Sequence, residues 1–235
     1  MRIAVIQHRL RETPEHDARG LAAAAAEAAG RGAELVVFPA VPSLQSDATA
    51  SDLLEQLLCD VAAHCLIPRP RGEVRGVALL TSLPAESGLE SELGELALLI
   101  GDACFDPAEL ARVAALGPSL AVLVPLSESD LQAEAVLELA IGLSDSLAGL
   151  VLIAECAGAD PGVPGHGGSA IVALGDVVAE AMTDDDVLLA DVATPVPQPE
   201  PREPLPQVAP ILVQRVAFHE GRKPDPPGGY PADLS

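Results

Sequence analysis

The sequence predicts an α/β fold in which helices cover the faces of β-sheets. Short apolar runs of strand length alternate with longer segments of helical periodicity through the first 192 residues. Hydrophobic residues make up 49% of the 235-residue chain, which is enough to form one sizeable core. Aromatic residues make up only 2% and tryptophan is absent, so Leu, Val, Ile and Ala must fill that core. We therefore expect one domain over residues 1–193 and a proline-rich tail over residues 194–235.

The first half of the domain begins with a strand, a helix and a second strand. Residues 2–7 (RIAVIQ) and 34–38 (ELVVF) are apolar runs of strand length. The alanine-rich segment 17–30 between them has the spacing of a helix and ends at a glycine. Leucines recur at helical spacing over residues 51–65, and a further apolar run over residues 77–82 predicts a third strand.

The second half contains more expected strands than helices. A helix is expected over residues 107–116, because Asp106 can cap its first turn and Pro107 fits its first position. A longer helix is expected over residues 130–147. Strands are expected at the remaining apolar runs, which cover residues 96–100, 120–124, 151–155, 169–173, 177–181 and 187–192.

The tail is expected to run extended. Prolines recur from Pro195 to Pro206, and a proline-rich segment cannot join the interior of a sheet. Residues 210–218 then contain an apolar run that predicts one more strand. This strand could pair with a partner subunit or close an edge of its own sheet, and both alternatives stay open.

The charge of the chain limits its partners. The net charge is −22, and between residues 76 and 199 the only basic residue is Arg112. Such a field repels nucleic-acid phosphates and anionic membranes and attracts cationic ligands or peptides, although it also serves simple solubility. Because few aromatic side chains are present to stack on bases, we expect neither nucleic acid nor a membrane as a partner.

The sequence also predicts a cytoplasmic protein. No apolar run approaches the length that spans a bilayer, and the N-terminus leads directly into a strand without the layout of a signal peptide. The four cysteines lack the spacing of a disulfide framework, which suits a reducing compartment.

Three blocks of the domain carry motifs that point to a family. They are the strand at 34–38 with Pro39 and Ala40 after it, the segment 98–112, and the segment 133–192 with its glycine-rich loop. In this order the blocks resemble the nitrilase superfamily of carbon–nitrogen hydrolases. The resemblance implies an α-β-β-α sandwich, in which two sheets pack face to face between helical layers.

The catalytic residues that the resemblance implies are missing. Family members attack a nitrile or amide carbon with a cysteine thiolate, move protons with a glutamate and stabilise the developing charge with a lysine. Here Ala40 stands in the glutamate position and Gly101 in the cysteine position, and the only lysine is Lys223 in the tail. Glu155 stands where family members usually have an asparagine after a strand. We therefore predict a pseudoenzyme without a cofactor, whose degenerate catalytic positions are Ala40 and Gly101.

The segment between Ala40 and Gly101 is short by family standards, which predicts a truncated and open pocket. In this respect the chain is similar to truncated hydrolase-like peptide-binding proteins of crocagin-type ribosomal peptide (RiPP) biosynthesis. We therefore predict a non-catalytic peptide-binding protein that presents a precursor peptide to a modifying enzyme. Arg69, Arg71 and Arg75 in the shortened region could hold carboxylates of the peptide, or could simply lie in a solvated loop.

Two other functions stay open. A residual amidohydrolase could use Cys104, which lies just before the expected helix start at Pro107. Acidic neighbours would raise the pKa of its thiol, and burial of the cysteine as a small apolar residue is the simpler interpretation. Alternatively, the chain could regulate a full-length hydrolase by hetero-oligomerisation. The resemblance also implies a homodimer that assembles through the helices at 107–116 and 130–147.

No metal site is predicted. Cys59 and Cys65 lie six residues apart on the expected helix 51–65, so their side chains would point to different faces, and no CxxC or matching histidine pair follows. His166 lies in the glycine-rich loop 162–168, where it could contact a ligand or belong to a tight connection into the next strand.

Overall fold

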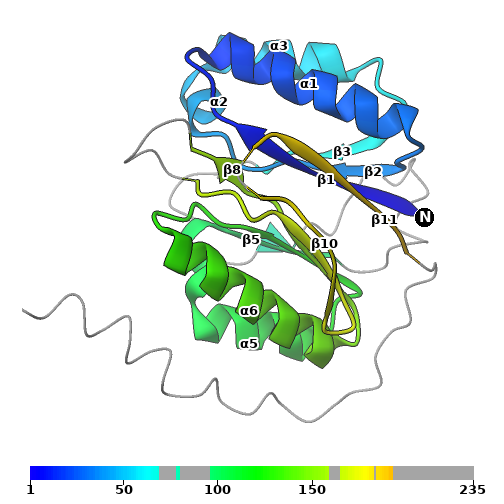
Figure 1. The fold of residues 1–235 in the computed structure, drawn as a ribbon, viewed down its shortest axis with the longest axis vertical. Helices are drawn as coiled ribbons and strands as arrows, with labels where there is room; N and C mark the ends of the chain where they lie inside the picture. Colours follow the sequence, from blue (N-terminus) through cyan, green and yellow to red (C-terminus); the bar gives the residue numbers. More distant parts are fainter. Residues whose placement is uncertain (69–77, 80–95, 159–164, 183, 193–235) are drawn as a thin grey trace, which may run out of the picture. The chain divides into compact units, whose positions relative to one another are not determined.

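The computed structural model describes residues 1–68, 78–79, 96–158, 165–182 and 184–192, which form two β-sheets (Figure 1). The first sheet has the order β11-β1-β2-β3, and the short strand β8 pairs with the end of β1. The strands of this sheet are β1 (Arg2–Arg9), β2 (Leu35–Val37), β3 (His64–Leu66), β8 (Cys156–Ala157) and β11 (Asp186–Asp191).

The second sheet has the order β10-β9-β7-β6-β5-β4. Its central strands β5, β6 and β7 run parallel, whereas β9 and β10 continue the sheet in antiparallel pairing. The strands of this sheet are β4 (Ala78–Leu79), β5 (Leu96–Ile100), β6 (Leu120–Val124), β7 (Leu150–Ile153), β9 (Ala170–Ala173) and β10 (Asp176–Glu180).

Helices cover the outer faces of both sheets (Figure 1). On the first sheet these are α1 (Pro14–Gly30), α2 (Pro42–Ser46) and α3 (Ala48–Leu58). On the second sheet they are α5 (Pro107–Leu116) and α6 (Asp130–Leu147), and a short 3₁₀ helix, η1 (Gly101–Phe105), leads from β5 towards α5. Side chains fix where several helices start, because a first-turn backbone N–H donates to Thr13, Asp47, Asp106 and Ser129 before α1, α3, α5 and α6.

The alternation of side chains along the strands builds three apolar clusters. On β1, Ile3 and Val5 face the second sheet, whereas Ala4 and Ile6 face the helices. On β6, Val122 likewise belongs to the cluster between the sheets, while its neighbours in sequence pack under α5 and α6. Helix, sheet, sheet and helix therefore form four layers, which confirms the expected α-β-β-α sandwich.

The helix expected over residues 51–65 forms, but its predicted C-terminal end is wrong. The helix α3 starts three residues earlier and ends at Leu58, and the strand β3 follows. The backbone N–H of His64 donates to the carbonyl of Glu34 at 2.9 Å, and Leu35 pairs with His64 in the parallel ladder to β2. Pairing with a distant strand thus overrides a leucine spacing that local sequence alone would continue as a helix.

Other boundaries shift by a few residues. α1 begins at Pro14 rather than at residue 17, and β7 ends at Ile153, so that residue 155 lies beyond the strand. Of the expected strand at 77–82, only β4 lies among the described residues. The tail at 194–235, with its expected strand at 210–218, lies outside them. In the part of the chain that the structure describes, no helix has the length and apolar character needed to cross a membrane.

Candidate functional site

The candidate site lies where β2 and β5 end. Ala40 follows β2 and Gly101 follows β5 directly. Ala40 is buried in the cluster between the two sheets, and Ile100, the residue before Gly101, packs against the same cluster. Ala40 and the residue before Gly101 therefore border the same apolar cluster, and both positions follow the carboxyl ends of parallel strands, where α/β folds commonly place their ligands.

Gly101 is in a backbone conformation that favours glycine. Its φ is +60°, in the left-handed region, and it starts the 3₁₀ turn of η1. Among the described residues, apart from chain neighbours, no heavy atom lies within 4 Å of where its Cβ would stand. With respect to the described residues there is space for a side chain at Gly101, but glycine contributes only backbone.

Cys104, the thiol nearest in sequence, is fully buried. It belongs to the cluster between the second sheet and α5, whereas Ala40 belongs to the cluster between the sheets. Its Sγ donates to the carbonyl of Leu99 at 3.4 Å. Burial raises the pKa of this thiol far above its ordinary value, and the charges of Glu155 and Asp102 raise it further. A raised thiol pKa agrees with the direction expected from the sequence, but burial contributes more to the shift than the acidic neighbours do.

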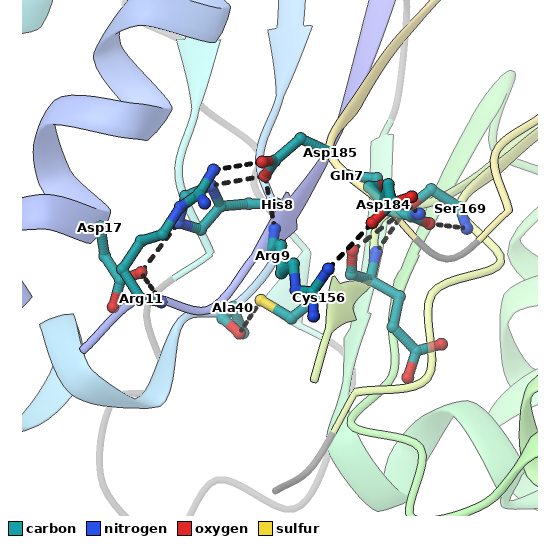
Figure 2. Close-up of polar contacts among 11 residues, drawn as sticks. Gln7, His8, Arg9, Arg11, Asp17, Ala40, Cys156, Ser169, Asp184 and Asp185 are labelled. Atoms are coloured by element: carbon teal, nitrogen blue, oxygen red, sulfur yellow. Dashed lines mark hydrogen bonds and ion pairs between the residues drawn. The ribbon is translucent and has the colours of Figure 1, made fainter. Parts of the chain in front are cut away.

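A second buried thiol, Cys156, lies against the degenerate site, and sequence reasoning gave it no role. Its Sγ donates to the backbone carbonyl of Ala40 at 3.4 Å, a contact visible in Figure 2. Burial is the main cause that raises the pKa of Cys156, followed by the charges of Asp17 and Glu155. Two thiols thus lie near the strand ends, and both are protonated at neutral pH.

Glu155 is a buried carboxyl group between β7 and β8, with a relative exposure of 1%. Its carboxyl oxygens accept from the backbone N–H of Ser127 at 2.7 Å and lie 3.0 Å from the Ser127 Oγ. Burial raises the pKa of Glu155 by more than the hydrogen bonds from Ser127 and from the backbone of His166 lower it. Glu155 therefore holds the loop after β6 in place.

Gln7 and Ser169 connect the two sheets beside this carboxyl group (Figure 2). Gln7 accepts from the backbone N–H of Ser169 at 2.9 Å and donates to the carbonyls of Met182 and Asp184. The Oγ of Ser169 lies 3.0 Å from the backbone N of Glu155. Among the described residues every buried side-chain polar atom has a hydrogen-bond partner.

A second polar cluster lies between β1, α1 and the start of β11 (Figure 2). The Nε2 of His8 is 2.8 Å from Asp17, and its Nδ1 is 3.4 Å from Asp185. Asp17 also accepts from the Ser43 Oγ at 2.6 Å and from the backbone N–H of Arg11 at 2.8 Å. This cluster fastens the helical layer to the first sheet, and nothing in the local sequence indicated it.

The remaining sequence candidates are dispersed. His166 forms a bridge with Ala157, and its Nδ1 lies 2.9 Å from Asp130, which favours the tight connection over a ligand site. Cys59 is exposed at the end of α3, whereas Cys65 lies on β3, where burial raises the pKa of its thiol to about 11. No group of three metal-ligating side chains occurs in the described ranges. Arg69, Arg71 and Arg75 lie outside them.

A cavity of about 420 Å³ lies on the other face of the first sheet. Phe38 and Val41 line it together with Leu21, Leu54 and Ile67 from beneath the helical layer. Ala40 is not among its lining residues, because its side chain faces the second sheet. The cavity is therefore separate from the degenerate catalytic positions.

The fold has solved counterparts. The NitN amidase from Nesterenkonia sp. AN1 superposes with a TM-score of 0.62 at 19% identity, over 82% of this chain and 93% of that chain. A cysteine-to-alanine mutant of the same amidase, described as from the nitrilase superfamily, gives a TM-score of 0.62 at 18% identity over 94% and 96% of the two chains. A glutamate-to-glutamine mutant, with acrylamide added at the active-site cysteine, gives 0.62 at 22% identity over 82% and 93%. No protein-family model and no curated protein sequence matches the chain. At these identities the likeness establishes the nitrilase-like fold.

Proposed function

We propose that this chain is a non-catalytic peptide-binding protein on an amidase-like fold, and that it presents a precursor peptide to a modifying enzyme. The observation that carries the first half of the proposal is the composition of the strand ends. Ala40 and Gly101 follow β2 and β5, where the resemblance implies a general base and a nucleophile. Groups of a catalytic triad act as a unit, so the loss of both leaves at most the residual effect of binding.

The groups that remain are poor substitutes for the missing ones. Nucleophilic attack requires a thiolate, and burial keeps the thiols of Cys104 and Cys156 protonated. A general base must reach the proton that it removes, but Glu155 is already bound to Ser127. These features support a pseudoenzyme over a residual amidohydrolase that uses Cys104.

We infer the ligand class from the charge and from the presence of sheet edges. A net charge of −22 attracts cationic ligands, and exposed sheet edges can bind an extended backbone by strand addition. Arg69, Arg71 and Arg75 stay our proposal for holding peptide carboxylates. The matched test is a variant with all three changed to serine, and unchanged affinity for the peptide would remove this part of the proposal.

Isothermal titration with peptides encoded by small reading frames beside the gene tests the function. We expect saturable binding at one peptide per subunit and no turnover of the peptide or of simple amides. Absence of binding across these peptides, together with co-purification of a full-length hydrolase, would instead support the regulatory-partner alternative. Amide turnover that Cys104→Ser abolishes would overturn the non-catalytic proposal.

The homodimer is part of the same proposal. The described surface has exposed leucines at the end of α5 and the start of α6, Leu116 at 42% and Leu131 at 65% relative exposure. Exposed apolar side chains on the two helices of the expected interface favour association there. Sedimentation velocity tests it, and a monomer at micromolar concentration would contradict it.

A further inference from the structure

The cavity beneath the helical layer of the first sheet has the size of a small-molecule site. Its volume is about 420 Å³, and pockets that bind small molecules are roughly 300–1,000 Å³ in volume. Well-packed interiors, by contrast, contain few voids larger than a water molecule. The described residues that line the cavity come from α1, α2 and α3 and from the segments that follow β2 and β3. Segments that are distant in the sequence thus surround one space that their side chains do not fill.

Short side chains on α3 leave this space open. Ala48, Ser51 and Asp52 are spaced i, i+3 and i+4, so they lie on one face of the helix, and all three line the cavity. The side chain of Asp47 accepts from the backbone N–H of Ala50 at 3.1 Å, which fixes where α3 begins. The preceding helix α2 has five residues and buries none of them. Local capping therefore sets the position of α3, and its small side chains do not reach across the cavity.

The cavity has an apolar floor and a polar rim. The floor consists of buried apolar side chains, among them Leu21, Phe38 and Leu54, each with a relative exposure of 3% or less. The rim consists of exposed polar side chains, among them Gln45 and Asp52. Contact of an apolar ligand group with the floor is favourable because it removes apolar surface from water. The lining therefore matches a ligand with an apolar body and a polar head group.

Asp52 selects the charge of that head group. Of the described residues that line the cavity it is the only charged one. Its carboxylate forms no ion pair with another described residue, so its charge is available to a ligand. The net charge of −22 adds a field that attracts cations and repels anions. The head group that fits the rim is therefore a cation.

We propose that this cavity binds a small organic cation, an ammonium ion that carries an apolar alkyl or aryl body. The apolar body contacts the floor, and the ammonium group pairs with Asp52 and donates to the side-chain oxygen of Gln45. This site goes beyond the proposed function, because it requires no peptide. It is also separate from the degenerate catalytic positions, since Ala40 is directed to the opposite face of the first sheet.

The test titrates phenethylamine into the isotope-labelled full chain and follows the amide NMR shifts. Phenethyl alcohol and hydrocinnamate keep the phenylethyl body and replace the ammonium by a neutral and a negative head group. We expect saturable shifts centred on α2 and α3, with a dissociation constant on the order of 1 mM. The alcohol should bind about fivefold more weakly, and hydrocinnamate should bind more weakly still. Equal affinities for the amine and hydrocinnamate, or no saturable shifts in α2 and α3, would overturn the proposal.

Matched variants separate Asp52 from the overall charge. Asp52→Asn should weaken phenethylamine by about fivefold and leave the alcohol unchanged. Glu12→Gln changes the net charge equally at an exposed position elsewhere and should change the affinity less than about twofold. An equal loss in both variants would show that only the overall charge acts and would overturn the proposal.

A variant that fills the cavity tests the apolar floor. Ser51→Phe places a large side chain in the space and should abolish the shifts caused by both the amine and the alcohol. Unchanged circular dichroism shows that this variant is folded, and unchanged binding to the folded variant would place the ligand elsewhere and overturn the proposal. If Ser51→Phe does not fold, the comparison of Asp52→Asn with Glu12→Gln decides, because both positions are exposed.

Competition with peptides encoded beside the gene distinguishes this site from the proposed function. Displacement of phenethylamine by such a peptide would show that an ammonium group of the peptide occupies the cavity, whereas simultaneous binding would show two separate sites. If no peptide binds and phenethylamine does, the proposed function is wrong and this site stands. If a peptide binds and phenethylamine does not, this site is wrong and the proposed function stands.

Discussion

Two buried acidic residues, Asp17 and Glu155, have pKa values that shift in opposite directions in this fold. Both have a relative exposure of 1%. Burial raises the pKa of Asp17, but the hydrogen bonds from His8, Ser43 and the backbone of Arg11 outweigh it, so the net shift is downward. Burial also raises the pKa of Glu155, and there the hydrogen bonds do not outweigh it. This difference indicates that the hydrogen-bond partners of a buried acid, rather than burial alone, decide whether its pKa rises or falls.

The contrast matters for function because the two acids lie in different regions. The hydrogen bonds to Asp17 connect α1 with α2 and β1. The negative charge of Asp17 therefore has a structural role. Glu155 lies beside the strand ends where the resemblance implies catalysis, and the fold favours its neutral form there. Two thiols of raised pKa, Cys104 and Cys156, lie in the same part of the fold as this carboxyl group.

Thiol labelling should give the largest effect. Cys59 is exposed, whereas Cys104 and Cys156 have no exposed surface. Labelling of the two buried thiols by Ellman's reagent at pH 7 should be slower by a factor on the order of 10⁴ or more, because it requires unfolding. Cys59→Ser should remove the fast phase and leave the slow phases unchanged. Fast labelling of Cys104 in the native protein would contradict the burial of this thiol and would support a reactive site.

The second largest effect is expected for a substitution of Asp17, the acid whose pKa is lowered. Asp17→Asn removes the carboxylate that accepts hydrogen bonds from Ser43 and the backbone of Arg11, and it should cost about 2 kcal/mol in the free energy of unfolding, measured by urea denaturation at pH 7. Asp52→Asn at an exposed position of α3 is the control and should have a much smaller effect.

The pH dependence of this cost follows from the lowered pKa of Asp17. A lowered pKa in the folded state means that the stabilisation is present above the unfolded pKa, 3.8, and is lost as the pH falls through the folded value. The difference between wild type and Asp17→Asn should therefore shrink below about pH 4. A difference that grew towards acid pH would show that Asp17 is not the charged partner.

The sequence predicted the layers of the fold well, because each layer depends on local patterns. The runs at 96–100 and 120–124 became strands over the expected residues, and the cap at Asp106 formed as its spacing indicated. The three residues of β3 escaped prediction because so short a run carries no period of its own. Only its pairing with β2, from which two helices separate it in the chain, makes it a strand.

The loss of catalytic residues at Ala40 and Gly101 stays a prediction from the resemblance, whereas the contacts around these positions could not be predicted from the sequence. Ala40 and Gly101 could be identified because a motif fixes their place in the chain. The contact between Cys156 and Ala40 joins residues 116 positions apart, and the bond between Glu155 and Ser127 joins residues 28 apart. No periodicity or spacing encodes such contacts, because they arise when two sheets pack and chain segments from both meet.

The smallest expected effect concerns Glu155. Glu155→Gln imitates the protonated carboxyl group: its amide oxygen can accept from the Ser127 N–H and its amide nitrogen can donate to the Ser127 Oγ. A raised pKa in the folded state means that wild type loses stability as the pH rises from the unfolded value, 4.5, through the folded value. The variant should therefore match wild type near pH 4 and gain about 1 kcal/mol relative to it by pH 8, measured by urea denaturation. Glu155→Ala is the control for packing and should be destabilised at every pH, because it leaves the Ser127 N–H without its acceptor. If Glu155→Gln instead lost stability as the pH rose, Glu155 would have a lowered pKa like Asp17.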